Sequence, residues 1–314
     1  MSVLGVISQL LEIALALLLA PLLVGWINQW RAWLQNRSGP GLLQPYRLLH
    51  KLFNKESVLA HHASPLFRAA PYIVFSCMLL ASAIIPTLST DLPLSPAADA
   101  IALVGLFALA RVFVSLAAMD VGTAFGSLGA RREMLIGFLA EPALLMVLFS
   151  ASLIPKSTSL TTIVETLAHR DLAIYPSLAF AGVAFVMISL AENARVPVDN
   201  PATHLELTMI HEALILEYSG RHLALLEWAA SLKLFAYSCL GLALFFPWGV
   251  AEAHAPLELV LALPALMLKL AVGGALLAVL ETASAKMRIF RVPEFLGTAF
   301  MLAVIGVLVH ILGV

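Results

Sequence analysis

Charged side chains and cysteines are both scarce in this sequence of 314 residues. Only 12% of the residues are Asp, Glu, Lys or Arg, about half the share found in a soluble globular domain. The two cysteines, Cys77 and Cys239, lie within apolar stretches, which favours packing roles over a disulfide or a metal site. Two thiols are too few for an iron–sulfur cluster, which needs about four. The net charge of −1 argues against nucleic acid as a partner.

Apolar residues make up 61% of the chain, and its mean hydropathy is +0.97. Apolar runs of about 17–25 residues cross a bilayer as helices. Because the N-terminal run has no basic segment before it and no cleavage site after it, it is expected to be a retained helix. The sequence therefore predicts an all-α, polytopic membrane helix bundle with about eight transmembrane helices, as a single domain over residues 1–314. The runs lie roughly at residues 3–27, 67–88, 99–120, 133–154, 173–191, 222–247, 257–281 and 293–313.

Lysine and arginine are distributed unequally between the two sides of this predicted bundle. The connections after the first, third, fifth and seventh runs, with their flanks, hold thirteen of them, and the other connections hold two. Because basic residues concentrate in cytoplasmic loops, the first set is predicted to face the cytoplasm. Both termini are then predicted to face the outside.

A short amphipathic segment follows Pro45 in the first of these connections. Its apolar residues are Leu48, Leu49, Leu52 and Phe53, and basic residues occupy the opposite side. At about ten residues the segment is too short to span a membrane. It is expected to lie flat at the interface as a surface anchor, with its lysines near anionic headgroups.

The connection Asp120–Glu133 contains three glycines and the pair Arg131–Arg132. This composition predicts a flexible, basic loop. Its glycine spacing matches neither common nucleotide-binding fingerprint, so a topology signal is favoured over a phosphate site.

Ionisable residues also lie inside the predicted spans, namely Arg111, Glu141, Lys233, Lys269 and, near a helix end, Glu281. An unpaired charge at the centre of a bilayer costs about 2.5–3.5 kcal/mol, so these groups are expected to face the interior and find partners. Glu141 lies about nine residues into its run, or ~13 Å along a helix axis. A carboxyl group that can be charged or neutral at that depth suits a proton relay. The alternative is a buried ion pair that only fixes packing.

The stretch Glu192–Gly220 concentrates more charge than any other part of the chain. Pro197 and Pro201 rule out a regular helix in its first half, and a helix is predicted from Leu205 to Gly220. Glu206 and Glu217 would share one face of that helix, about 16 Å apart, lining either a polar cavity or a surface for a partner. The ionisable side chains of the stretch are Glu192, Arg195, Asp199, His204, Glu206, His211, Glu212 and Glu217.

A metal site is not predicted in this stretch. His211–Glu212 begins like a zinc-protease motif, but position 215 is Ile where the motif needs His. Isolated histidines near an interface are more often hydrogen-bonded structural groups.

Two long motifs resemble the first large membrane subunit of respiratory complex I. One is E-N-A-R-V-P-V-D-N-P at residues 192–201, followed by Glu206 and by E-Y-S-G at residues 217–220; the other is G-P-G-L-L-Q-P at residues 39–45. The same subunit recurs in group 4 membrane-bound [NiFe] hydrogenases and formate hydrogenlyases. Shorter features at Gly129–Glu133, Glu141–Pro142 and Lys286–Arg288 are closer to this hydrogenase branch. Asn200 and a longer Glu206–Glu217 spacing weigh against a quinone site.

The resemblance implies a membrane anchor and proton-coupling subunit that does not itself catalyse the redox reaction. It would dock a soluble arm onto the bacterial or archaeal cytoplasmic (inner) membrane. The expected partners are a large [NiFe]-hydrogenase-like subunit, a small iron–sulfur subunit and antiporter-like membrane subunits. The [NiFe] centre and iron–sulfur clusters would lie in these partners, and no cofactor is expected in this chain.

The resemblance also implies roles for particular residues. Arg195 would hold Asp199 or a carboxylate of a partner. The residues expected to dock partners are Arg195, Gln44, Arg131, Arg132 and Tyr218. The residues expected in a proton path are Glu141, Glu192, Asp199, Glu206, Glu212, Glu217, Arg111, Lys233 and Lys269.

Three other functions stay open at this stage. The chain could line the quinone chamber of a complex I-type NADH or ferredoxin:quinone oxidoreductase. It could be an autonomous secondary transporter with charges at mid-membrane, although the sequence shows no inverted repeat. It could also be a purely structural anchor whose carboxylates only make salt bridges at an interface.

Overall fold

A computed structural model gives the structure of this chain and describes residues 3–169, 176–199, 209–251 and 256–312. Seven helices in this part are long and apolar enough to cross a membrane, and α7 is a shorter apolar helix of 17 residues. The predicted all-α bundle of about eight apolar helices is therefore confirmed. These helices are α1 (Val3–Leu34), α3 (Pro65–Ile84), α4 (Ala100–Asp120), α5 (Ala124–Ser152), α7 (Pro176–Glu192), α9 (Gly220–Phe245), α10 (Pro256–Ala283) and α11 (Val292–Leu312).

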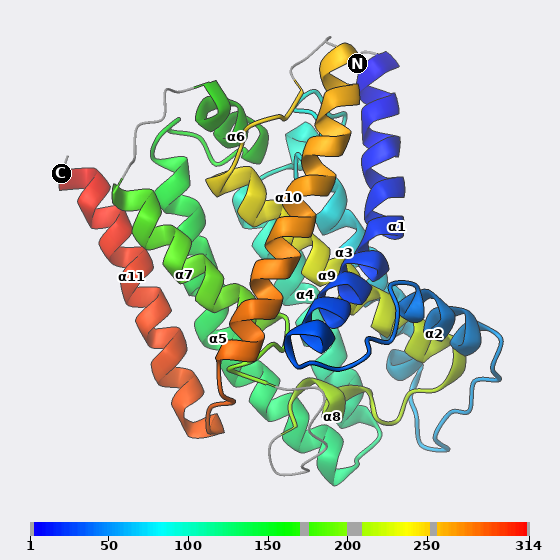
Figure 1. Cartoon of the computed structure of the whole chain (residues 1–314). Coiled ribbons are helices and arrows are strands. Elements are labelled where there is room, and N and C mark those ends of the chain that lie inside the picture. The colour runs from blue at the N-terminus through cyan, green and yellow to red at the C-terminus, as the bar shows by residue number, and fades with distance from the viewer. Residues whose placement is uncertain (1–2, 170–175, 200–208, 252–255, 313–314) are drawn as a thin grey trace.

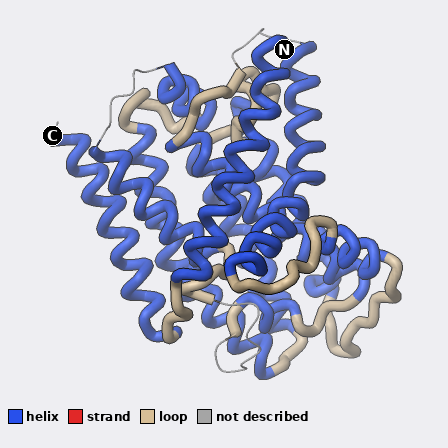
Figure 2. The backbone as a smooth tube through the Cα atoms, in the orientation of Figure 1, coloured by secondary structure: helices blue, strands red, loops and turns tan. Residues whose placement is uncertain are grey.

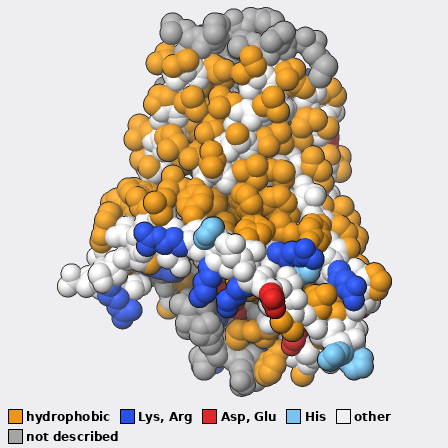
Figure 3. All heavy atoms as spheres, turned by 90° about the vertical axis from the view of Figure 1, so that its right-hand side faces the viewer, with side chains coloured by type: hydrophobic (Ala, Val, Ile, Leu, Met, Phe, Trp, Pro, Cys, Tyr) orange, Lys and Arg blue, Asp and Glu red, His pale blue; other side chains and the backbone are white. Residues whose placement is uncertain are grey.

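The long helices run side by side, and the connections gather at the two ends of the bundle (Figures 1 and 2). Helix α3 packs against α4 and α9, and α5 packs against α4, α7 and α11, while α1 packs against α9 and α10. The start of α1 and the end of α11 lie at one end of the bundle, and the short helices α2 (Gln44–Phe53) and α8 (His211–Ile215) lie at the other (Figure 1). We call the end with α2 and α8 the basic end, because Lys and Arg side chains gather there (Figure 3).

Side-chain caps start several of these helices. The side-chain oxygens of Ser64, Asp99 and Thr123 accept the backbone N–H of the residue two or three positions later, at 3.1, 2.8 and 3.3 Å. Each cap satisfies one of the backbone donors that a helix leaves unpaired at its start. In a membrane this matters more, because no water is present to take the donor's hydrogen bond.

Helix α2 is the amphipathic segment that the sequence predicts. Leu49 and Leu52 are buried against Ala224 of α9, and the Phe53 ring meets Trp228 edge-on at 6.2 Å between ring centroids. Leu48 is exposed. The helix therefore packs on the bundle through two leucines and offers other apolar groups outward, as an interfacial helix does.

The predicted flexible loop at Asp120–Glu133 is wrong. Helix α5 already begins at Ala124, capped by Thr123. A Cβ atom added at Gly129 would lie 2.8 Å from the Cβ of Ala213 in α8. Gly129 is thus needed because α8 approaches α5 closely at this position. From the sequence alone, a glycine required by close packing looks the same as a glycine required by a flexible loop.

The predicted continuous helix from Leu205 to Gly220 is also wrong. Within the described residues 209–219, only His211–Ile215 is helical, and Gly220 already belongs to α9. Tyr218 turns inward, stacks on Phe67 with 4.0 Å between ring centroids and donates its hydroxyl to the Phe67 carbonyl at 3.0 Å. The helix therefore ends before Glu217. Glu206 lies outside the described residues.

Gly220 begins α9 in a left-handed conformation, with φ at +54°. A Cβ atom there would lie 2.8 Å from the carbonyl oxygen of Glu56 and 2.9 Å from that of Lys55. We expect Gly220→Ala to lower the thermal unfolding midpoint of the purified chain, because the left-handed conformation alone costs about 1–2 kcal/mol for a residue with a Cβ. Gly105→Ala in α4, whose added Cβ meets nothing within 4 Å, is the matched control. Equal thermal unfolding midpoints for the two variants would contradict this account of the turn at Gly220.

Candidate functional site

Arg111 lies halfway along α4, and only 4% of its side chain is exposed. Its guanidinium group contacts three carboxylates. Nε is 3.3 Å from Glu133 of α5, and the two terminal nitrogens donate to Glu141 of α5 and Glu192 of α7. A single cation thus ties α4 to two neighbouring helices. Removing one partner from such a buried pair leaves an uncompensated charge, which costs about 3–5 kcal/mol.

Two residues of α9 complete this cluster around Glu192. The Lys233 ammonium nitrogen is 2.8 Å from Glu192 Oε2. Tyr237 stacks on Phe107 at 4.8 Å and interacts with Glu192 through its hydroxyl. We call Arg111, Glu133, Glu141, Glu192 and Lys233 the Arg111 cluster.

The Arg111 cluster contains three carboxyl groups and two cations. With all five groups ionised its formal charge is −1, so binding of one proton brings it to zero. Room for the guanidinium depends on Gly137, where an added Cβ would lie 2.4 Å from an Arg111 nitrogen. The arrangement can therefore store or release one proton without leaving the arginine unpaired.

A small cavity of about 50 Å³ separates the Arg111 cluster from α8 at the basic end. Arg111, Glu133, Lys233 and His211 supply its polar lining, and apolar side chains supply the rest. A polar cavity of this size can hold a few water molecules, since one water needs about 10–15 Å³ of such volume. The cavity thus places space for water between the Arg111 cluster and α8.

A groove of about 590 Å³ lies on the other side of the cluster, between α4, α5 and α11. Glu141 lines it with 31% of its side chain exposed. The other lining residues are apolar or glycine and include Phe138 and Phe300. Glu141 therefore joins the buried cluster to the lateral surface of the bundle.

A second set of ion pairs holds the connection after α7 in place. Arg195 donates to Glu281 of α10 at 3.1 Å, and Arg31 of α1 lies 3.6 Å from the same carboxylate. The Asp199 carboxylate pairs with Lys286 at 3.1 Å and also accepts the backbone N–H at the start of α8 at 3.3 Å. Arg195 was expected to hold Asp199 or a partner's carboxylate; within this chain its side chain pairs with Glu281, and a contact with a partner stays a prediction.

The structure brings four of the expected proton-path residues together and places four others elsewhere, whereas Glu206 lies outside the described residues. Arg111, Glu141, Glu192 and Lys233 belong to the Arg111 cluster, whereas Asp199 belongs to the second set of ion pairs. Around α8, Glu212 is half-buried and Glu217 is exposed. Lys269 donates to the carbonyl oxygens of Phe246 and Trp248, beyond the end of α9.

The expected docking residues differ in their accessibility. Gln44 and Arg131 are exposed at the basic end. Arg132 is half-buried and donates to the Met209 carbonyl at 2.8 Å. Tyr218 packs inside the chain, and burial raises the pKa of its hydroxyl. Whether any of these residues touches a partner stays a prediction.

The site residues expected from the sequence do not include two carboxylates, Glu133 and Glu12, that make close contacts in the structure. Glu133 was assigned to a loop border, and it joins the Arg111 cluster. Glu12 of α1 is buried, and one of its oxygens accepts the backbone N–H groups of residues 87–89 at 3.2, 2.8 and 3.2 Å. Glu12 interrupts an apolar run just as Glu141 does, so the same signal could have found it.

Within the residues that the structure describes, no group of three or more His, Cys, Asp or Glu side chains is placed to hold a metal ion. The cavity beneath α8, at about 50 Å³, is far below the roughly 300–1,000 Å³ of a typical organic ligand pocket.

The chain is similar to known membrane proteins over nearly its whole length. Residues 7–312 match the family described as NADH dehydrogenase. The chain is 33% identical to formate hydrogenlyase subunit 4 of Escherichia coli K12, covering 94% of this chain and 95% of that one. It is 33% identical to hydrogenase-4 component C of the same organism, covering 96% and 94%. Among solved structures, a chain of the archaeal membrane-bound sulfane sulfur reductase, an archaeal respiratory membrane complex, shares the fold with a TM-score of 0.83 at 20% identity, covering 96% and 98%.

We expect Arg111→Gln to lower the thermal unfolding midpoint of the purified chain strongly, because three carboxylates then face one another with only Lys233 to balance them. The expected loss is about 3–5 kcal/mol. Adding Glu192→Gln to this variant should restore part of the stability, which a double-mutant cycle measures. Arg288→Gln, at an exposed position, is the control and should shift stability by no more than about 0.5 kcal/mol. A single variant as stable as this control would contradict the role given to Arg111.

Proposed function

Since this chain belongs to the NADH dehydrogenase family, we propose that it is the membrane anchor and proton-coupling subunit of a complex I-like, energy-converting hydrogenase complex. The single observation that carries the proposal is the Arg111 cluster. It holds one carboxyl group more than it has cations, and it lies between a cavity next to α8 and a groove on the lateral surface. The names of the relatives support a hydrogenase-type complex.

The first part of the proposal concerns the basic end. By the positive-inside rule this end faces the cytoplasm, where a soluble arm with a [NiFe] centre and iron–sulfur clusters would dock. The exposed Arg131 lies on the surface that surrounds α8. Two cysteines cannot supply the clusters, so the redox chemistry belongs to the arm. This chain contributes the surface and the carboxylates beneath it.

The second part concerns proton uptake. A change of charge in the docked arm changes the field at the Arg111 cluster, which has one carboxyl more than it has cations. A proton can then reach Glu133 through the cavity beneath α8 and be shared with Glu141, because both carboxylates contact the same guanidinium. The arginine keeps the other carboxylates paired throughout.

The third part concerns release toward a neighbour. Glu141 faces a groove that is otherwise apolar, and a charge facing hydrocarbon is costly. A membrane subunit of the antiporter-like class that covers the groove with a polar group would both relieve this cost and accept the proton. Such a partner also explains why the groove lies between three transmembrane helices rather than at an end of the bundle.

Purification of the intact complex tests the identity of the partners. Affinity-tagged chain, extracted from native membranes in mild detergent, should co-purify with a subunit containing nickel and iron, measured by elemental analysis of the peak fraction. Hydrogen evolution should co-elute with it. A chain that purifies alone and transports an ion in vesicles would instead identify a secondary transporter, and bound quinone would identify a quinone-chamber subunit.

We expect Glu141→Gln in the assembled complex to lower the number of protons translocated per electron toward zero, while the redox activity of the arm persists. Glutamine keeps the size and the hydrogen bond to Arg111 but cannot carry the proton. The measurement uses a pH indicator in sealed vesicles together with the rate of electron transfer. The control is Glu294→Gln at an exposed position on α11. An unchanged ratio in Glu141→Gln removes this residue from the path.

A further inference from the structure

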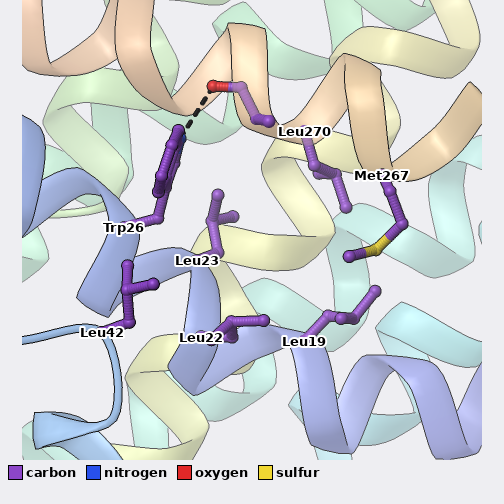
Figure 4. A pocket seen from close by; sticks show the side chains of 8 residues that line it. Leu19, Leu22, Leu23, Trp26, Leu42, Met267 and Leu270 are labelled. Carbon is purple, nitrogen blue, oxygen red and sulfur yellow. Dashed lines mark hydrogen bonds between the residues drawn. The ribbon is translucent and has the colours of Figure 1, made fainter. Parts of the chain in front are cut away.

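An apolar cavity of about 160 Å³ lies between α1 and α10, away from the Arg111 cluster (Figure 4). Leucines of α1, Leu42 of the following connection, and Met267 and Leu270 of α10 form its walls. The Trp26 indole N–H also lines it and already donates to the Ala271 carbonyl at 2.9 Å. An apolar cavity of about 150 Å³ accepts a ligand of about the size of benzene. This space therefore suits a short hydrocarbon segment and offers no polar contact to a headgroup.

The wall of the cavity continues into tryptophans of the kind that mark the border between lipid and water in membrane proteins. Trp26, Trp30 and Trp33 form a ladder along the last turns of α1, with centroid separations of 5.7 and 5.6 Å between successive rings. Tryptophans concentrate at this border in membrane proteins. Because Trp26 forms one wall of the cavity, the ladder starts at the cavity and leads toward the basic end.

Basic side chains gather in a band across the face of the molecule that Figure 3 shows, toward the basic end. From Arg31 to Arg68 the sequence contains six Lys or Arg residues and one acidic residue, Glu56. The Tyr46 hydroxyl donates to the carbonyl of Leu18, which holds the first turn of α2 against α1 at the level of the cavity wall. The exposed basic residues of the band are Arg37, Arg47, Lys51, Lys55 and Arg68.

We propose that this chain binds one anionic phospholipid at this place. One acyl chain enters the α1–α10 cavity, and the phosphate lies on Arg47 and Lys51 of α2. An anionic phospholipid has both parts that the site requires, a hydrocarbon tail for a cavity without free donors and a negative headgroup for a band with a strong excess of positive charge. The bound lipid joins α1, α2 and α10, which meet at the basic end where the soluble arm would dock.

Native mass spectrometry of the full chain in detergent tests the proposal. The chain is titrated with phosphatidylglycerol or with phosphatidylethanolamine, and the first binding step is compared. We expect phosphatidylglycerol to bind more tightly, and Met267→Trp to weaken it at least tenfold by filling the cavity. Leu268→Trp, at an exposed neighbouring position outside the cavity, should leave binding unchanged. Arg47→Gln and Lys51→Gln should each weaken phosphatidylglycerol about fivefold and leave phosphatidylethanolamine unaffected.

Several results would overturn the proposal. Equal affinity for the two lipids would show that charge does not select the ligand, and full binding by Met267→Trp would show that the cavity does not hold the chain. Circular dichroism establishes the fold of each variant. If Met267→Trp does not fold, the two α2 variants decide the question, because their side chains are exposed. Intact binding in both of them would be decisive against the site, as would a partner's transmembrane segment found in the cavity of the assembled complex.

Discussion

The contact between the Arg111 guanidinium and its three carboxylates is the interaction on which the central part of the bundle depends. An arginine in the middle of an apolar helix is tolerated only when its charge is balanced. Here Glu133, Glu141 and Glu192 balance it from two other helices, so α4, α5 and α7 must adopt one relative position for all three contacts to form. The contacts that balance the charge of Arg111, and so allow α4 to lie in the membrane, also fix how α4 packs against α5 and α7.

Glycines make this arrangement sterically possible. At Gly137 a side chain would occupy the space of the guanidinium, and at Gly129 it would meet α8. Both positions lie on α5, the helix that also carries two of the carboxylates. One face of α5 thus provides both carboxylates and the space for their partner, and Glu141 on that face also lines the lateral groove.

A proton path through the Arg111 cluster would have two different ends. The cavity beneath α8 reaches toward the basic end, whereas the groove beside Glu141 opens onto the membrane side. A structural anchor needs carboxylates at its docking surface but does not need a buried group with one acid in excess. This excess supports the proposed coupling function and sets the cluster apart from the ion pairs of Arg195 and Asp199, which hold a connection in place.

The sequence by itself determined the class and the transmembrane helices, because apolar runs of bilayer length have no other stable form in lipid. It also indicated that Arg111, Glu141 and Lys233 would be paired, since their burial is otherwise too costly. It did not determine which carboxylate each cation would meet. Glu133 was missed because the first turns of α5 were predicted to be a loop. The helix over Leu205–Gly220 was predicted too long because the inward turn of Tyr218 depends on Phe67, far away in the chain. Pairing between helices and the end points of short segments are decided by contacts between distant residues, so only the tertiary structure could supply them.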